Sequence, residues 1–365
     1  MDTLDKAREK INEVDRELAR LFVTRMHAVE EVARYKEARG LPIFDEKRER
    51  EVLEKSGALV DDDTLRSYFL LFMEETMKLS KTYQKSLMTG APIAYSGVEG
   101  AFAHIAAKQL FPTGSHVAYS DFASAYAAVE KGECELCVLP IENSFAGEVA
   151  QVLDLMYHGS LSITGVYELR VKHNLLALPS ADPQKIRTVL SHPQALDQCA
   201  GYIRSHALTP KEAVNTAVAA ETVAAMKDET VAAIASAETA ALYGLSVIDH
   251  DINESDTNTT RFAVFSRTPN RTAYRKGDVF LLFFTIQNTA GALAKAVNVI
   301  SAYGFNMHVL RSRPVKDKPF QYYFYVEAEG DDQSERGQAM LNALSVSCQS
   351  LKVVGRYTPE SKTES

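Results

Sequence analysis

The sequence predicts a multidomain protein with an all-α segment at its start, an α/β segment in its middle and a smaller α+β segment at its end. The length of 365 residues exceeds what one hydrophobic core usually holds, so two or three domains are expected. Apolar residues near the start recur at three- and four-residue steps, which indicates amphipathic helices. From residue 91 short apolar strands alternate with helices, and from about residue 275 the order is strand, helix, strand, strand, helix, strand.

Composition and charge narrow the class of protein. With 46% hydrophobic and 24% charged residues, the chain has the composition of an ordinary globular protein. Its formal net charge of -8 argues against nucleic acid and membrane surfaces as general partners. The chain opens in a charged amphipathic helix rather than a targeting peptide, and no apolar run is long enough to span a bilayer. We therefore expect a cytoplasmic location.

The cysteine, histidine and carboxylate residues show no metal-ligand spacing, so we expect no metal. Cys134 and Cys137 have the spacing of a redox motif, but they belong to an apolar stretch that reads as a buried strand. Two residues three apart on a strand face opposite sides, so both cysteines are predicted to be core residues.

The first segment, residues 1–88, is predicted to contain three helices. The first ends before Gly40, the second follows Asp45, and the third runs from about Asp63, whose side chain can cap it, to Gln84. A helical hairpin that only dimerises would also explain this pattern. The apolar positions of the first helix are Leu4, Ile11, Val14, Leu18, Leu21, Phe22, Val29 and Val32.

Three basic residues of the first helix resist that simpler explanation. Arg25 and Lys36 are eleven residues apart, so they share a helical face about 16 Å apart along the axis. Arg8 is seventeen residues from Arg25, which turns it by about 100° and places it about 25 Å away. If all three bind one ligand, a second subunit must supply Arg8.

This pattern resembles the all-helical chorismate mutase family, whose dimers exchange their long first helices. The resemblance implies a pericyclic rearrangement of chorismate to prephenate, which needs no nucleophile and no proton transfer. Arginines would bind the two carboxylates, Lys36 and Gln84 would donate to the ether oxygen, and acidic residues would hold the substrate hydroxyl and orient the neighbouring arginine. The positions carried over are Arg8, Arg25, Lys36, Asp45, Arg48, Glu49, Ser80 and Gln84.

The middle segment, residues 91–268, places polar groups where its predicted strands end. Glu142, Asn143 and Ser144 follow one strand, and a Ser-His-Pro-Gln run begins at Ser191 after another. The loop Asp256 to Phe262, reading DTNTTRF, enters a third strand with hydroxyl, amide and guanidinium groups. Strand ends in open α/β sheets are where ligands collect, so these groups are predicted to meet.

These three stretches resemble the signatures of the prephenate dehydratase family. The resemblance implies two lobes with a cleft between them, similar to type II periplasmic binding proteins. It also implies that Thr260 donates a hydrogen bond to the departing hydroxyl and that Asn143 and Gln198 are active-site amides. Glu142 and Ser144 are carried over as substrate-binding residues, whereas Arg261 either binds a carboxylate or braces the loop.

One loop of the middle segment departs from the family pattern. Residues 97–103 read GVEGAFA, which lacks two hydroxyls of the family's usual Gly-Pro-Glu-Gly-Thr-Phe-Ser, and this puts a substrate role of the loop in doubt.

The last segment, residues 275–357, has the strand and helix order of a ferredoxin-like unit. It resembles the ACT domain that senses phenylalanine, and a dimerisation module without a ligand is the alternative. Arg311 stands where the family has glutamate, so inhibition is weaker or the pocket differs. The polar residues 360–365 are expected to be disordered. The effector-binding positions that the resemblance implies are Gly291, Ala292, Leu293, Ser312 and Arg313.

The three resemblances occur in the order found in bifunctional chorismate mutase/prephenate dehydratases, and together they cover nearly the whole chain. They imply a cofactor-free enzyme, a homodimer or higher oligomer, which acts on chorismate and prephenate and is inhibited by L-phenylalanine. A dehydratase that prefers arogenate is one alternative. An amino-acid-binding regulator with inactive catalytic lobes is another. The presence of Thr260, Lys36 and Gln84 counts against it, because an inactive protein would not need hydrogen-bond donors at these positions.

Overall fold

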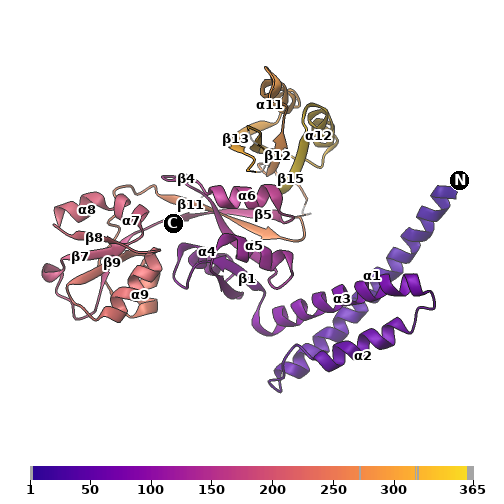
Figure 1. The fold of residues 1–365 in the computed structure, drawn as a ribbon, viewed down its shortest axis with the longest axis horizontal. Helices are drawn as coiled ribbons and strands as arrows, with labels where there is room; N and C mark the ends of the chain where they lie inside the picture. The colour runs from indigo at the N-terminus through magenta and orange to yellow at the C-terminus, as the bar shows by residue number, and fades with distance from the viewer. Residues whose placement is uncertain (1–2, 271–272, 317, 319, 360–365) are drawn as a thin grey trace. The chain divides into compact units, whose positions relative to one another are not determined.

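The structure is a computed structural model that describes residues 3–270, 273–316, 318 and 320–359. The chain divides into two compact units (Figure 1). The first holds residues 1–93 with the short segments 113–115 and 131–135, and the second holds the remainder. The tail that was expected to be disordered, residues 360–365, lies outside the described residues.

The first unit contains three helices, as the sequence predicts. The cap of the third is Asp62 rather than Asp63, because Asp62 lies outside the helix in extended conformation and accepts from the amides of Thr64 and Leu65 at 2.8 and 3.0 Å. This helix also continues past Gln84 and ends at Thr89, before Gly90, whose φ is +79°. The helices are α1 Thr3–Glu37, α2 Glu46–Gly57 and α3 Asp63–Thr89.

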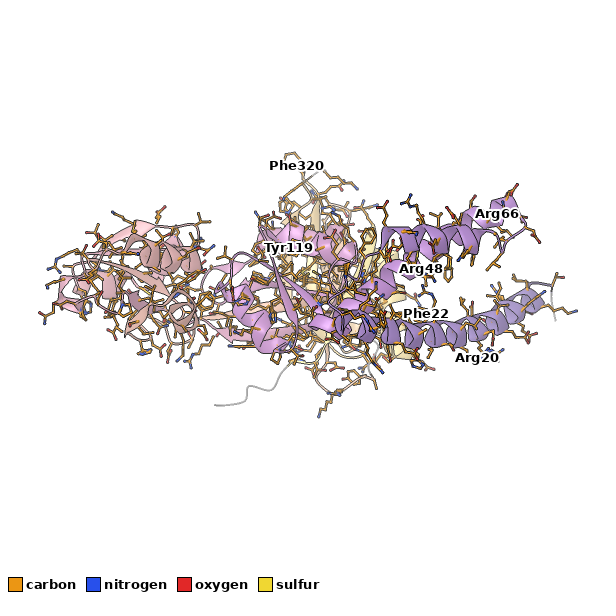
Figure 2. The ribbon with its side chains drawn as sticks, turned by 90° about the horizontal axis from the view of Figure 1, so that it is seen from below. Arg20, Phe22, Arg48, Arg66, Tyr119 and Phe320 are labelled. Carbon is orange, nitrogen blue, oxygen red and sulfur yellow. The ribbon has the colours of Figure 1, made fainter. Side chains whose placement is uncertain are left out.

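The apolar face of α1 is uncovered over its first five turns. Six of its large apolar side chains are between 41% and 58% exposed, Phe22 among them (Figure 2). A stripe of this kind at helical spacing normally packs against another helix. The residues of this stripe are Leu4, Ile11, Val14, Leu18, Leu21 and Phe22.

The second unit begins with a lobe whose central strands are antiparallel. Strand β11 lies between β5 and β3, with Thr260 opposite Asn143. Helix α5 is capped by Asp121, which accepts from the amide of Ser124 at 2.8 Å. The strands are β1 Pro92–Ser96, β2 Ser115–Tyr119, β3 Leu136–Asn143, β4 Gly147–Glu148, β5 Ser162–Arg170 and β11 Thr259–Ser266, and the helices are α4 Phe102–Leu110, α5 Phe122–Glu130 and α6 Ala150–His158.

The chain leaves this lobe after β5 and returns to it in β11, and a second lobe is built between these points. Its five-stranded sheet has the order β10-β6-β9-β7-β8, and helices α7, α8 and α9 lie beside it (Figure 1). The strands are β6 Asn174–Ala177, β7 Thr188–Ser191, β8 Thr209–Glu212, β9 Val231–Ala235 and β10 Ser246–Asp249, and the helices are α7 Pro193–Gln198, α8 Ala200–Ser205, α9 Thr216–Met226 and α10 Ala237–Tyr243, with a 3-10 turn at Pro183–Lys185.

The C-terminal part has the ferredoxin-like strand order β13-β14-β12-β15 that its sequence predicts. Strand β12 is buried along its whole length. Phe280 and Phe284 pack against α11 and α12, whereas Phe283 on the other face contacts Tyr157 of α6. The elements are β12 Val279–Thr285, α11 Ala292–Ala302, β13 Asn306–Pro314, β14 Tyr322–Glu329, α12 Glu335–Ser347 and β15 Ser350–Tyr357.

This C-terminal sheet joins the sheet of the first lobe, which the sequence did not predict. Gly355 of β15 pairs with Ile163 of β5 in parallel, and one ten-stranded sheet results. A Cβ atom at Gly355, whose φ is +156°, would lie 2.2 Å from the carbonyl oxygen of Ile163. Only glycine therefore permits the two backbones to approach so closely.

Candidate active site

A cleft of about 390 Å³ in the second unit is lined by residues of both lobes. Ala101, Phe102 and Phe262 come from the first lobe, and His192 and Ala195 come from the second. Among the described residues that line it there is no lysine, arginine, aspartate or glutamate. The polar lining side chains are Asn143, His173, His192, Gln194, Gln198, Asn215, Thr216, Asn258 and Thr260.

Thr260 and Asn143 meet in this cleft as predicted, and backbone amides fix the orientation of Asn143. The amides of Phe145 and Ala146 donate to Asn143 Oδ1 at 3.0 and 2.9 Å, so that oxygen is the acceptor end of the side chain. Asn143 Nδ2 must then donate to Thr260 Oγ1, which lies 2.9 Å away. Because Thr260 is an acceptor in this bond, its own hydroxyl proton remains available to a molecule in the cleft.

The hydrogen bonds extend from Asn143 through Asn258 to the predicted amide Gln198, which also bonds His173; the sequence analysis missed both Asn258 and His173. Asn143 Nδ2 donates to Asn258 Oδ1 at 2.9 Å, and Asn258 Nδ2 donates to Gln198 Oε1 at 2.9 Å. His173 Nε2 lies 2.8 Å from the same Gln198 oxygen. Asn258 could have been found, since it belongs to the DTNTTRF loop, but no sequence motif marks His173.

Arg261 and Glu142 do not line the cleft, whereas the family resemblance implies substrate contact for Glu142 and allows it for Arg261. They neighbour Thr260 and Asn143 in sequence, and successive strand residues face opposite sides. Arg261 bonds Glu142 at 3.0 Å and Tyr357 at 2.8 Å, while Arg311 also donates to Glu142. These contacts favour the alternative that Arg261 is a brace.

Charge pairing explains why these two groups are stable outside the cleft. Burial alone would raise the pKa of Glu142, but hydrogen bonds from Arg311 and Arg261 hold it below its ordinary value. Burial alone would lower the pKa of Arg261, but Glu327 raises it well above that of a free guanidinium. Both groups are thus firmly ionised.

Ser144 does not line the cleft, whereas part of the loop at residues 97–103 does. Ser144 Oγ accepts from the amide of Thr259 at 3.0 Å and bonds the carbonyl of Thr257, so it braces the loop and lies outside the cleft lining. Ala101 and Ala103, which stand where the family has hydroxyls, do line the cleft. Their part of the lining is apolar apart from the backbone.

In the first unit, Arg25, Ser80 and Gln84 come together between α1 and α3. Arg25 donates to Ser80 Oγ, and Gln84 Nε2 lies 3.3 Å from the Ser80 carbonyl. Burial lowers the pKa of Arg25, and no carboxylate pairs with it among the described residues. A half-buried guanidinium in this state is suited to an anionic ligand.

The remaining candidates of the first unit are more dispersed. Lys36 Nζ donates to the carbonyl of Ile43 at 2.6 Å, and Asp45 caps α2 through the amide of Arg48. Glu49 pairs with Lys81 at 2.8 Å rather than with an arginine, which differs from its predicted orienting role. The guanidinium of Arg48 is exposed (Figure 2) and so is Arg8.

The predicted effector residues divide into two groups. Gly291 and Leu293 line a pocket of about 370 Å³, and Ala292 lines an adjoining one. Ser312 and Arg313 line neither of these pockets. Arg313 instead bonds Glu148 at 2.7 Å and Asp154 at 3.4 Å, both in the first lobe.

Three further observations concern metals, membranes and cysteines. Across the part of the chain that the structure describes, no three histidine, cysteine or acidic residues are placed to hold a metal ion. No helix there is both long and apolar enough to cross a membrane. Cys134 and Cys137 are buried, which confirms their prediction as core residues.

Comparison with known proteins finds a family model for each of the two segments that hold a candidate site. Residues 7–85 match the family model described as chorismate mutase type II, and residues 93–270 match that described as prephenate dehydratase. The chain is 33% identical to a bifunctional chorismate mutase/prephenate dehydratase of Enterobacter agglomerans over 368 aligned residues, which cover 97% of this chain and 95% of that protein.

Two solved structures resemble the second unit. One, described as GqqA, a novel type of quorum quenching acylase, has a TM-score of 0.69 at 32% identity, and the match covers 74% of this chain and 98% of that one. The other is the prephenate dehydratase of Arthrobacter aurescens in complex with L-Phe, with a TM-score of 0.67 at 24% identity over 73% of this chain and 89% of that one.

Proposed function

Because this chain belongs to the family of bifunctional chorismate mutase/prephenate dehydratases, we propose that it converts chorismate to prephenate and then prephenate to phenylpyruvate, carbon dioxide and water. The observation that carries the dehydratase half is the bond from Asn143 to Thr260, which leaves the Thr260 proton available in an uncharged cleft. Residues 1–88 would hold the mutase, 91–268 the dehydratase and 275–357 an ACT regulatory domain.

The mutase reaction needs a folded substrate conformer and stabilisation of the charge that develops on the ether oxygen. Arg25 is assigned to a substrate carboxylate because it is half-buried beside Ser80 without an acidic partner among the described side chains. Lys36 and Gln84 are assigned to the ether oxygen, and Arg48 and Arg8 to the remaining carboxylate. Asp45 and Glu49 would contact the substrate hydroxyl.

For the dehydratase, aromatisation of the ring drives loss of carbon dioxide, so the protein has mainly to assist departure of the hydroxyl group. Thr260 is assigned to donate a hydrogen bond to that oxygen. The substrate carboxylates would meet the N-termini of α4 and α9, since Ala101, Phe102 and Thr216 line the cleft. Helix N-terminal amides are unpaired within the helix and carry partial positive charge.

The cleft favours dehydration over acyl transfer. Among its described lining residues, side-chain hydroxyls come from Thr216 and Thr260, and no serine or cysteine is present. A hydroxyl nucleophile needs an adjacent base. The side chain bonded to Thr260 is the amide of Asn143, which donates and cannot remove a proton.

L-phenylalanine is assigned as a feedback inhibitor that binds the C-terminal domain near Gly291 and Leu293. Support comes from the pocket at these residues and from the L-Phe complex of the Arthrobacter aurescens structure. Arg311 and Arg313 form ion pairs with Glu142, Glu148 and Asp154 of the first lobe, which gives this domain direct contact with a strand that carries Asn143.

A cytoplasmic homodimer is the assembly that we assign. The uncovered apolar stripe of α1 supports it, because a second copy of the same helix offers a matching surface. Arg8 lies on that helix, far from Arg25, and would complete the mutase site of the partner.

A coupled assay on the purified protein tests the whole proposal. Chorismate should disappear while phenylpyruvate accumulates, and L-phenylalanine should slow the second step. A parallel assay with arogenate separates a preference for the aminated acid, because phenylalanine would then form faster than phenylpyruvate. Binding of L-phenylalanine without any product from chorismate would instead establish the regulator alternative.

A further inference from the structure

His173 is held rigidly between the two lobes. It follows β5 and precedes β6, is 2% exposed, and has backbone hydrogen bonds on both sides: its amide donates to Asn253 Oδ1 at 3.1 Å and its carbonyl accepts from Ile252 at 2.8 Å. The ring of Phe102 packs edge-on against the imidazole with centroids 5.8 Å apart. The ring therefore has little freedom to turn.

The tautomer of His173 follows from the backbone amides that orient Asn143. Since Asn143 donates to Asn258 Oδ1, the amide nitrogen of Asn258 must donate to Gln198 Oε1. An oxygen that accepts one bond can accept a second but cannot donate, so His173 Nε2 carries the hydrogen in its 2.8 Å bond to Gln198. Burial lowers the pKa of His173, which keeps the ring neutral near pH 7.

We propose that His173 is a positioning residue for the dehydration: its Nε2–H group holds the Gln198 amide so that the oxygen is engaged by protein and the NH2 group is the donor offered to the substrate. This inference rests on the proposed dehydratase function. Prephenate carries two carboxylates and a keto group, all acceptors. If the amide were rotated by half a turn, it would present an acceptor to this dianion and lose its bonds to both His173 and Asn258.

Gln198 has no acceptor for its amide nitrogen among the described side chains and backbone, which is consistent with a donor kept for a ligand. His173 Nδ1 is also buried without a partner in the described residues, so the ring has two distinguishable edges. One edge acts on Gln198, and the other could contact the substrate directly. These two roles have different consequences for substitution.

The test compares His173→Gln with His173→Asn in the full-length enzyme. A glutamine amide nitrogen can reach the position of imidazole Nε2, whereas an asparagine amide reaches only that of Nδ1. We expect His173→Gln to keep kcat/KM for prephenate within about threefold of the wild type and His173→Asn to lower it about tenfold or more. Thermal unfolding of both variants and their mutase turnover provide the controls for folding.

A double variant identifies the route of the effect. If His173 acts through Gln198, then His173→Asn should lower kcat/KM no further in a Gln198→Ala background. Additive losses, or a His173→Asn variant more active than His173→Gln, would overturn the proposal and assign Nδ1 to direct substrate contact. Failure of the wild-type enzyme to convert prephenate would contradict the proposed function itself, which separates the two hypotheses.

Discussion

Arg261 donates two parallel hydrogen bonds to Glu327, from Nη1 at 3.1 Å and from Nη2 at 2.7 Å. Glu327 belongs to the C-terminal sheet and is 2% exposed, and Arg261 follows Thr260 on β11. Neighbouring strand residues face opposite sides, so one short segment places Thr260 in the cleft and Arg261 at the C-terminal domain. The candidate chemistry and the candidate regulation share this strand.

Glu327→Ala should reduce the free energy of unfolding by about 3 kcal/mol, because it leaves the Arg261 guanidinium buried with only part of its charge compensated. Denaturant unfolding of the purified variant measures this loss. Inhibition of the dehydratase by L-phenylalanine should weaken in the same variant.

The matched control is the double variant Arg261→Met with Glu327→Met, which removes both charges. It should recover most of the lost stability while inhibition stays weak. Normal inhibition in both variants would show that this ion pair is structural and does not couple the domains.

Thr260→Ala should lower dehydratase kcat by about a hundredfold to a thousandfold, since it removes the donor to the departing hydroxyl. Mutase turnover should be unchanged, and prephenate should accumulate when chorismate is supplied. Thr260→Ser keeps the hydroxyl that Asn143 orients, so it should retain most of the activity. Equal losses in both variants would contradict a role for the hydroxyl.

The sequence predicts most of the fold because its local signals agree with its tertiary contacts. The three helices of the first segment and the order of strands in the C-terminal part are as predicted. Period-two alternation alone could also have shown that Thr260 and Arg261 face opposite sides. What it could not show is which side meets the cleft, because that depends on the neighbouring lobes.

Other features depend on contacts between distant segments and leave no local signal. The join of the C-terminal sheet to the first lobe rests on a single pair, Gly355 with Ile163. Arg313 belongs to the Ser-Arg-Pro motif of the predicted effector site, but its side chain forms ion pairs with Glu148 and Asp154 of the first lobe. His173 acts through its position after β5, and a lone histidine between Lys172 and Asn174 gives no indication of that.

The free energy of unfolding should decrease as pH falls below 6.5, the ordinary pKa of histidine, because His173 is buried in its neutral form. Burial lowers its pKa below the ordinary 6.5, so the unfolded chain binds more protons than the folded chain as pH falls through 6.5, and the loss is complete below the folded pKa. The free energy of unfolding of the wild type minus that of His173→Gln should therefore decrease as pH falls through 6.5. His104, whose pKa burial also lowers, is present in both proteins and cancels. A difference that does not change with pH would show that folding leaves the pKa of His173 unshifted.

Lys36→Ala should lower mutase turnover by about a thousandfold, to near background, because it removes the donor assigned to the ether oxygen. Dehydratase activity on added prephenate should be normal, since Lys36 belongs to the first unit. The bond from Lys36 to the Ile43 carbonyl links two exposed or half-buried groups, so its loss should change stability little. Near-normal mutase turnover in the folded variant would remove Lys36 from the site.

Arg8→Ala and Lys36→Ala should complement each other if the mutase site is shared between subunits. Each homodimer alone should be inactive as a mutase. In a heterodimer, one site combines both defects, but the other combines an intact Arg8 with an intact Lys36. Co-expression of two differently tagged chains should therefore restore about a quarter of the wild-type turnover when dimers form at random, and a purified heterodimer should show about half. Absence of any restoration would mean that Arg8 acts within its own subunit, and an active Arg8→Ala homodimer would mean that Arg8 takes no part in the site.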